Sequence, residues 1–123
     1  MNSRMIMLCG LLLLTSTMLS AQTKNATVFG EVVDIASYMT SGTRASSPEG
    51  KEMIEASARG GNPLGILEEN TGKIYLVTMK QAGLGANTSL LPWVGMKVAA
   101  KGDVYKKGSC QVLVLNVIGK SIK

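Results

Sequence analysis

The stretch GEVVDIASYM, residues 30–39, decides how the rest of the chain is interpreted, because its character changes halfway. Its first half contains the β-branched residues Val32, Val33 and Ile35. Such residues favour a packed strand, and we expect this strand to cover 27–35. Gly30 interrupts the pattern, which indicates a bend, a bulge or the close approach of another backbone. From Ser37 the chain leads into a polar segment, so the stretch predicts a strand that ends at the rim of a site or in a loop.

A second stretch repeats the order glycine, acid, valine, with GEV at 30–32 and GDV at 102–104. Small barrels need sharply coiled strands, and a glycine within a strand permits the coiling. With Gly30 and Gly102 in the first and fourth of five expected strands, the fold class is mainly β. We expect a small five-stranded OB-like Greek-key barrel with a short helix inserted between strands 1 and 2. An unrelated five-stranded sandwich or an α+β roll is the alternative.

The insertion carries helix signals over 48–59. Ser46 or Ser47 can cap the helix, and Pro48 suits its first turn. Two glycines at 60–61 end the helix before Pro63, to which we assign a structural role.

The other elements follow from alternation of apolar residues and from turn residues. The segment EENTG at 68–72 supplies a tight reversal between two strands. The remaining expectations are a flexible loop at 40–47, strands at 64–67 and 73–79, a loop or one short helix at 81–92, and strands at 95–105 and 110–118.

The first 21 residues have the pattern of a secretory signal peptide. Arg4 is positive, 5–14 are apolar, and small residues precede a cleavage point after Ala21. The apolar run is shorter than the roughly 20 residues that a membrane-spanning helix needs. We therefore expect 1–21 to be a signal peptide and 22–123 a single OB-like barrel domain, periplasmic or secreted, with no membrane span after cleavage. An uncleaved anchor is the alternative.

The sequence excludes several kinds of site. It has no His, which removes a Ser-His-Asp triad, a Cys-His pair and a His-based zinc site. After cleavage Cys110 is the only cysteine, so no intrachain disulfide is possible. Because Cys110 opens the apolar run 110–118, we expect a buried core thiol. Asp34 lies late in an apolar strand, where we expect it to accept hydrogen bonds from loop backbone groups rather than to act in catalysis.

Taken together, the pieces resemble a family of small exported bacterial proteins with an OB-like barrel, most of them uncharacterised. The family pattern opens with a GEVVDLACYM-type strand, continues through a helix with a His and a C-x-x-x-C pair, and then has GxPxGLL, GKxYLV and a final VTGxV hairpin. The residues of this chain that carry the resemblance are 30–34, 38–39, 61–65, 72–77 and 102–104.

The chain departs from that pattern at every residue that would bind a metal or undergo redox chemistry. Ser37 stands where the family has a Cys after the first strand, Met53 and Ser57 stand at the Cys pair, and the His position falls on Gly50. The resemblance therefore implies a site that has lost its thiolates and imidazole. A thioether could bind a soft cation such as Cu(I), but we expect Met39 and Met53 to belong to the core.

The leading hypothesis is a non-enzymatic binding or interaction module of the cell envelope, whose partner is a small ligand or another envelope protein. The expected contact residues lie on the rim: Ser37, Tyr38, Met53 and Ser57. One alternative is a metal- or redox-linked protein with a degenerate Cys/His site that uses Met39, Met53 and Cys110. Another is an OB-type binder of oligonucleotides or oligosaccharides. We expect no nucleic-acid partner, because basic and aromatic residues do not interleave. We also expect no catalytic residue, no metal ligand and no cofactor.

Overall fold

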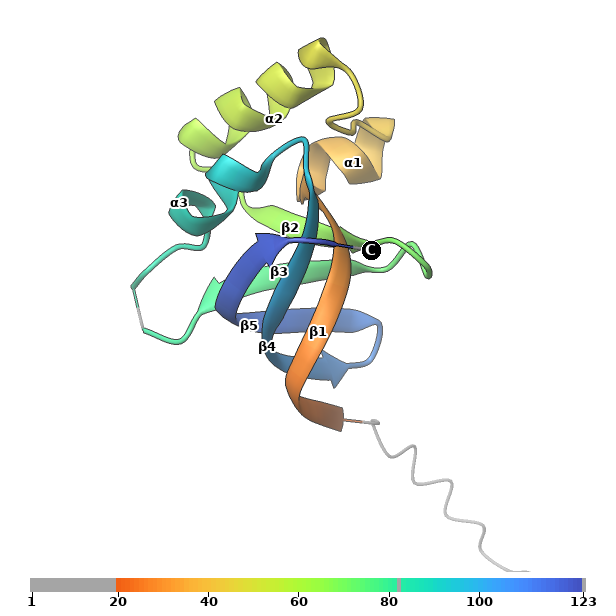
Figure 1. Ribbon diagram of the computed structural model, residues 1–123, viewed down its shortest axis with the longest axis vertical. Coiled ribbons are helices and arrows are strands. Elements are labelled where there is room, and N and C mark those ends of the chain that lie inside the picture. Colours follow the sequence, from red (N-terminus) through yellow and green to blue (C-terminus); the bar gives the residue numbers. More distant parts are fainter. Residues whose placement is uncertain (1–19, 82, 123) are drawn as a thin grey trace, which may run out of the picture.

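The computed structural model describes residues 20–81 and 83–122 (Figure 1). It is mainly β, as the sequence predicts. The elements in chain order are β1 (Ser20–Asp34), α1 (Ile35–Ser41), α2 (Pro48–Arg59), β2 (Leu64–Glu68), β3 (Ile74–Met79), α3 (Asn87–Leu90), the 3-10 turn η1 (Leu91–Trp93), β4 (Lys97–Lys107) and β5 (Cys110–Lys120). Nearly all of the expected signal peptide lies outside the described residues, and its expected end at Ala21 falls at the second residue of β1.

The five strands form one sheet that closes into a ring in the order β1-β2-β3-β5-β4. Neighbouring strands are antiparallel except β3 and β5, which are parallel. The long strand β1 closes the ring because it serves two neighbours. Its residues from Gly30 to Asp34 pair with β2, and those from Ser20 to Glu31 pair with β4.

Two glycines allow the strands to bend tightly enough for this closure. A Cβ atom added at Gly30 would lie 1.9 Å from the carbonyl oxygen of Leu67 on β2. One added at Gly102 would lie 2.0 Å from the carbonyl oxygen of Val114 on β5, beside a register shift in the β4–β5 pair. Close backbone approach, one of the three alternatives expected at Gly30, is therefore present at Gly30 and also at Gly102.

The core lies inside the ring and under the helices. It is built from the inward-facing residues of all five strands, among them Val32, Ile66 and Leu113, which are fully buried. Ile54 from α2 and Leu90 from α3 join the same cluster and are also fully buried. The helices gather at one end of the ring (Figure 1), so they close that end with apolar side chains.

The local signals of the insertion and of the first hairpin are confirmed. The helix α2 covers the predicted residues, and Ser47 caps it by accepting a hydrogen bond from the Gly50 amide at 3.1 Å. The strands β2 and β3 form the predicted antiparallel hairpin.

Several boundaries differ from the prediction, above all both ends of the first strand. The first strand begins at Ser20 rather than at 27, because 20–23 pair with the far end of β4. The segment after Asp34 is not an extension of the strand into a flexible loop, since Ile35–Ser41 form α1. Asp34 caps this helix, and Gly42, with φ 68°, ends it in the left-handed conformation.

Cys110 is exposed, so the expectation of a buried thiol is wrong. It pairs with Lys107 at the tip of the β4–β5 hairpin, and the first residue of the run to be buried is Leu113. The apolar run therefore begins outside the core.

The exposure of Cys110 gives a simple chemical test. Ellman's reagent should modify Cys110 in the folded protein without denaturant, and a Cys110→Ser variant should lose that fast reaction. Peptide mapping after alkylation locates the modified residue. Reaction at Cys110 only after unfolding would contradict the exposed hairpin tip.

Candidate functional site

A buried carboxylate organises the end of the ring that the helices cover. Asp34, the last residue of β1, is fully buried. Its Oδ2 atom accepts hydrogen bonds from the Ser37 amide at 3.3 Å, from the Ser37 hydroxyl, and from the Ser57 hydroxyl at 2.9 Å. One side chain therefore joins the end of β1 to both α1 and α2, through one backbone amide and two hydroxyl groups.

The polar network continues from α2 to α3. The side-chain amide of Asn62 donates to the Ser57 hydroxyl at 2.7 Å. Asn87 donates to the carbonyl oxygens of Asn62 at 2.7 Å and Ala58 at 3.1 Å, and accepts from the Leu64 amide at 3.0 Å. These contacts fix the helices relative to the start of β2.

Pro63 contributes through its backbone at the same place. Its carbonyl oxygen accepts a hydrogen bond from the Ile35 amide at 3.4 Å, so the first residue of α1 is tied to the residue before β2. This contact joins the two ends of the inserted segment.

The four expected rim residues lie in three separate places. Ser37 and Ser57 meet at Asp34, although they are 20 positions apart in the sequence. Tyr38 lines a separate pocket. Met53 is 57% exposed and Met39 is 69% exposed, so the expectation that both belong to the core is wrong. Met39 lies on α1, which has no buried residue, and Met53 lies on α2, whose buried residues are Gly50, Ile54 and Ala58.

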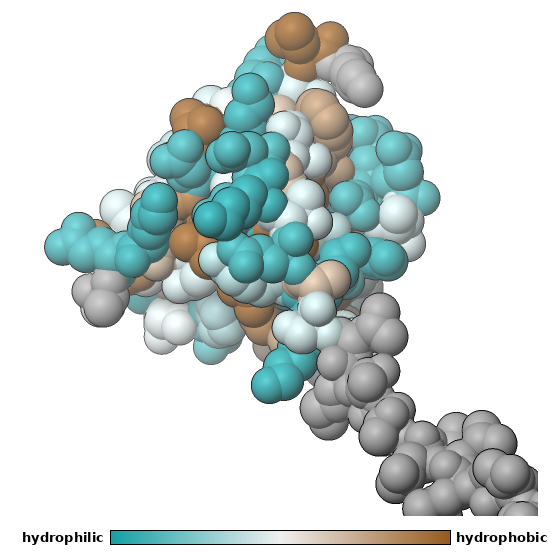
Figure 2. All heavy atoms as spheres, turned by 90° about the horizontal axis from the view of Figure 1, so that it is seen from below, coloured by the Kyte–Doolittle hydropathy of each residue, from teal (hydrophilic) through white to brown (hydrophobic). Residues whose placement is uncertain are grey.

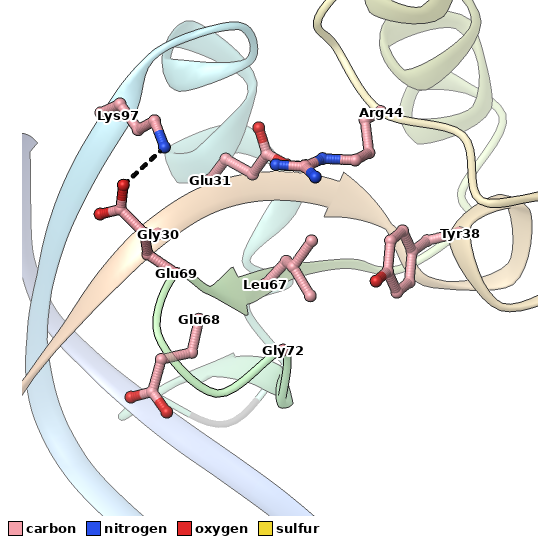
Figure 3. A pocket seen from close by; sticks show the side chains of 9 residues that line it. All are labelled: Gly30, Glu31, Tyr38, Arg44, Leu67, Glu68, Glu69, Gly72 and Lys97. Atoms are coloured by element: carbon pink, nitrogen blue, oxygen red, sulfur yellow. Dashed lines mark hydrogen bonds and ion pairs between the residues drawn. The ribbon is translucent and has the colours of Figure 1, made fainter.

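The pocket that contains Tyr38 opens on the side of the ring just below the helices (Figure 3) and has a volume of about 130 Å³. Its walls come from β1, α1, the segment before α2, the β2–β3 hairpin and the first residue of β4. The lining residues are Gly30, Glu31, Tyr38, Arg44, Leu67, Glu68, Glu69, Gly72 and Lys97.

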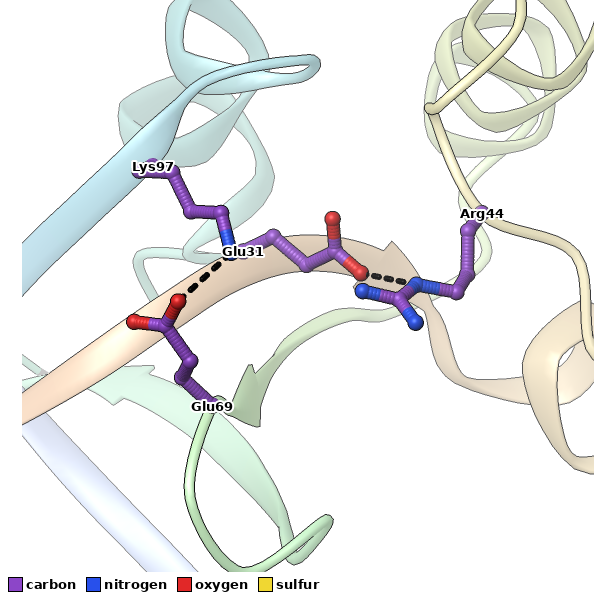
Figure 4. Close-up of polar contacts among 4 residues, drawn as sticks. All are labelled: Glu31, Arg44, Glu69 and Lys97. Atoms are coloured by element: carbon purple, nitrogen blue, oxygen red, sulfur yellow. Dashed lines mark hydrogen bonds and ion pairs between the residues drawn. The ribbon is translucent and has the colours of Figure 1, made fainter.

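Two ion pairs define the chemistry of this rim pocket (Figure 4). Arg44 pairs with Glu31, whose side chain is only 14% exposed. Lys97 pairs with Glu69, with 2.8 Å between Nζ and Oε1. The Lys97–Glu69 pair joins β4 to the β2–β3 turn and so depends on the closed ring, whereas Glu31 and Arg44 lie 13 positions apart on either side of α1.

The remaining polar group of the pocket lies at its hairpin side. Glu68 accepts a hydrogen bond from the Thr71 hydroxyl, and its side chain points away from the two ion pairs (Figure 3). Burial, followed by the nearby Glu68 carboxylate, raises the pKa of the Tyr75 phenol above its usual range. The pocket therefore offers carboxylates, two cations and the Tyr38 ring around an apolar floor at Leu67.

Sequence reasoning did not identify the charged residues of the pocket. Glu31 was visible only as the acid of the repeated glycine-acid-valine order, and Arg44 only as a residue of a loop. The register that places Glu31 opposite Lys97 brings β1 and β4 together at this rim. No spacing within either strand alone indicates that arrangement.

The residues of the metal hypothesis do not converge. Met39 belongs to α1 after the end of β1, whereas Cys110 lies beside Lys107, which flanks the start of β1 in the sheet. Within the described residues no three or more His, Cys, Asp or Glu side chains form a group that could hold a metal ion.

Two further findings bear on the surroundings of the site. Within 20–81 and 83–122 no helix is long and apolar enough to cross a membrane. No protein-family model, no curated protein and no solved structure matches the chain.

Proposed function

We propose that the protein is an exported, non-enzymatic binding module of the cell envelope whose rim pocket binds a small polar ligand. The observation that carries the proposal is the pocket itself, in which two ion pairs and the Tyr38 ring surround an apolar floor. Concave sites with a few convergent polar groups are the usual form of ligand-binding sites. The signal-peptide pattern of 1–21 supports export.

The strand order supports an OB-type barrel as the scaffold. A ring in the order β1-β2-β3-β5-β4, with β1 shared by two neighbours, supports the proposal of a five-stranded Greek-key barrel. Barrels of this type bind ligands through strand faces and the loops beside them. The rim pocket lies where β1 passes into the insertion, which agrees with that use of the scaffold.

The size and charges of the pocket favour a compact ligand with several hydrogen-bonding groups. A volume of about 130 Å³ corresponds to about four water molecules. Arg44 can donate to a ligand oxygen through the guanidinium nitrogens that do not bind Glu31. Glu69 and Glu31 can accept from hydroxyl groups, and the Tyr38 ring offers a flat apolar surface. A terminal sugar unit of an envelope oligosaccharide has this combination of hydroxyl groups and an apolar ring face.

The proposed binding is tested by titrating monosaccharides and short oligosaccharides while recording NMR shifts of the protein. We expect perturbed amides to cluster around the rim pocket. Arg44→Ala and Tyr38→Ala should each weaken the binding at least about ten-fold, the loss expected when a charge-assisted hydrogen bond or an aromatic contact is removed.

Two matched controls separate the pocket from general effects of charge and aromaticity. Arg59 forms an exposed ion pair with Glu55 on α2 away from the pocket, so Arg59→Ala should leave binding unchanged. Tyr105 is an exposed tyrosine near the opposite end of β4, so Tyr105→Ala should also have no effect. Equal weakening by Arg59→Ala, or no shift with any saccharide, would overturn the proposed ligand class.

A further inference from the structure

A second hollow lies on the outer surface of the ring, away from the rim pocket. It is a shallow groove of about 670 Å³ over β1, β4, β5 and the residues that follow β5. This volume falls within the range of about 300–1,000 Å³ that is typical of small-molecule sites. The rim pocket and the groove have no lining residue in common.

The groove exists because its floor is made of small residues. Ala99 on β4 pairs with Phe29 on β1 and with Gly119 on β5, so these three residues form one row across the sheet. A Cβ atom added at Gly119 would meet no atom within 4 Å, which confirms open space above the floor. Phe29 bounds the row on one side, and the exposed apolar residues Val117 and Ile122 extend the groove on the other.

Two lysines flank this apolar floor. Lys101 lies in the row next to Ala99, paired with Val117, and Lys120 follows Gly119. Both are exposed, and neither forms an ion pair with the acidic residues of the described chain, whereas Lys97 at the same edge is paired with Glu69. The groove therefore combines an apolar surface with positive charge that has no acidic partner among the described residues.

We propose that this groove binds a free long-chain carboxylate, with the acyl chain along the Ala99–Gly119 floor and the carboxylate beside Lys101 and Lys120. Burial of a hydrocarbon chain supplies the affinity, and the lysines select an anionic headgroup. The positive charge of the two lysines complements the negative charge of the carboxylate.

A second copy of the chain is a poorer occupant. A symmetric contact through this face would bring the lysines of both copies together, and like charges at an interface oppose association. On the face opposite the helices, hydrophobic side chains form small groups among hydrophilic ones (Figure 2). The groove itself is lined by nine residues, fewer than the roughly 20–30 residues per partner that a stable protein interface uses, so it suits one amphiphile better than a second protein.

Isothermal titration calorimetry of the purified protein with dodecanoate, below its micelle concentration, tests the proposal. We expect saturable binding at a single site. Dodecyltrimethylammonium, which has the same chain and the opposite charge, should bind at least about ten-fold more weakly. Equal affinity for the two amphiphiles would show that the lysines do not favour an anionic headgroup, and would overturn the proposal.

Variants then locate the site. Gly119→Leu fills the floor in open space and should abolish binding while the thermal unfolding temperature stays near that of the wild type. Lys101→Ala combined with Lys120→Ala should weaken dodecanoate binding about ten-fold or more. Lys106→Ala combined with Lys107→Ala removes the same charge at the hairpin tip and should leave binding unchanged.

The same experiments distinguish binding of a long-chain carboxylate in the groove from dimerisation and from binding at the rim pocket. Wild-type binding by Gly119→Leu, equal losses in the two double-lysine variants, or dimerisation in sedimentation without dodecanoate binding would each overturn the proposal. Arg44→Ala should bind dodecanoate as the wild type does, because Arg44 lines only the rim pocket. Failure of saccharide binding at the rim therefore leaves this test unaffected.

Discussion

Replacing Asp34 by alanine is expected to lower the free energy of unfolding by about 3 kcal/mol. The substitution removes the N-cap of α1, which is worth about 1 kcal/mol. It also leaves the hydroxyls of Ser37 and Ser57 without their acceptor in a partly buried place, at about 1 kcal/mol or more each. Urea unfolding followed by the fluorescence of Trp93 measures the change.

Two companion variants make the Asp34 result specific. Asp34→Asn retains one acceptor oxygen and should lose about half as much stability. Glu52→Ala removes an exposed carboxylate on α2 and should change the free energy by less than about 0.5 kcal/mol. If Asp34→Ala were as stable as Glu52→Ala, the carboxylate would not hold α1 and α2 against the ring.

Replacing Gly30 by alanine is expected to destabilise the protein by about 3 kcal/mol or more, or to prevent its folding. The added Cβ would lie 1.9 Å from the Leu67 carbonyl oxygen, a contact with backbone that no side-chain rotation relieves. To avoid the overlap β1 and β2 must separate where Gly30 pairs with Glu68, which opens the ring at that point. Chemical unfolding, or the yield of folded protein, measures the effect.

Gly119→Ala is the matched control for this prediction. Gly119 also lies in a strand, but an added Cβ there meets no atom within 4 Å. We expect the stability of Gly119→Ala to be within about 1 kcal/mol of the wild type. Where an added Cβ meets no atom, the substitution changes mainly the conformational entropy that this residue loses on folding. Equal losses at Gly30 and Gly119 would mean that glycine is needed for flexibility rather than for close approach.

The elements that the sequence predicts well are those whose signals are local. Ser47, Pro48 and the glycines at 60–61 mark the ends of α2 without reference to other parts of the chain. The turn at 68–72 likewise defines the β2–β3 hairpin. Glycines within strands at 30 and 102 indicated a closed sheet, because each allows a neighbouring backbone to approach.

The elements that the sequence misses depend on tertiary contacts. Ile35 continues an apolar strand pattern, yet it begins α1 because Asp34 turns inward to meet Ser57 of α2. Cys110 belongs to an apolar run, but pairing with β4 carries it beyond the core. In both cases residues distant in sequence decide the local structure.

The candidate site also combines residues that the sequence indicated with residues that only the fold brings together. The family resemblance directed attention to Ser37 and Ser57, and the structure brings their hydroxyls to one carboxylate oxygen. The ion pairs of Arg44 and Lys97 with their acidic partners had no sequence signal, since four separate segments supply the four residues. Only the register of the closed ring places them around one pocket.

The sharing of β1 between two neighbours also bears on how the chain folds. Gly30 pairs with Glu68 and with Val98, so the final closure joins residues far apart along the chain. The loop-closure entropy of such contacts must be overcome before they contribute stability, and folds rich in them are slow. The β2–β3 and β4–β5 hairpins are local and need no distant partner. Because β1 lines both hollows, neither hollow is complete until this strand has paired with β2 and β4.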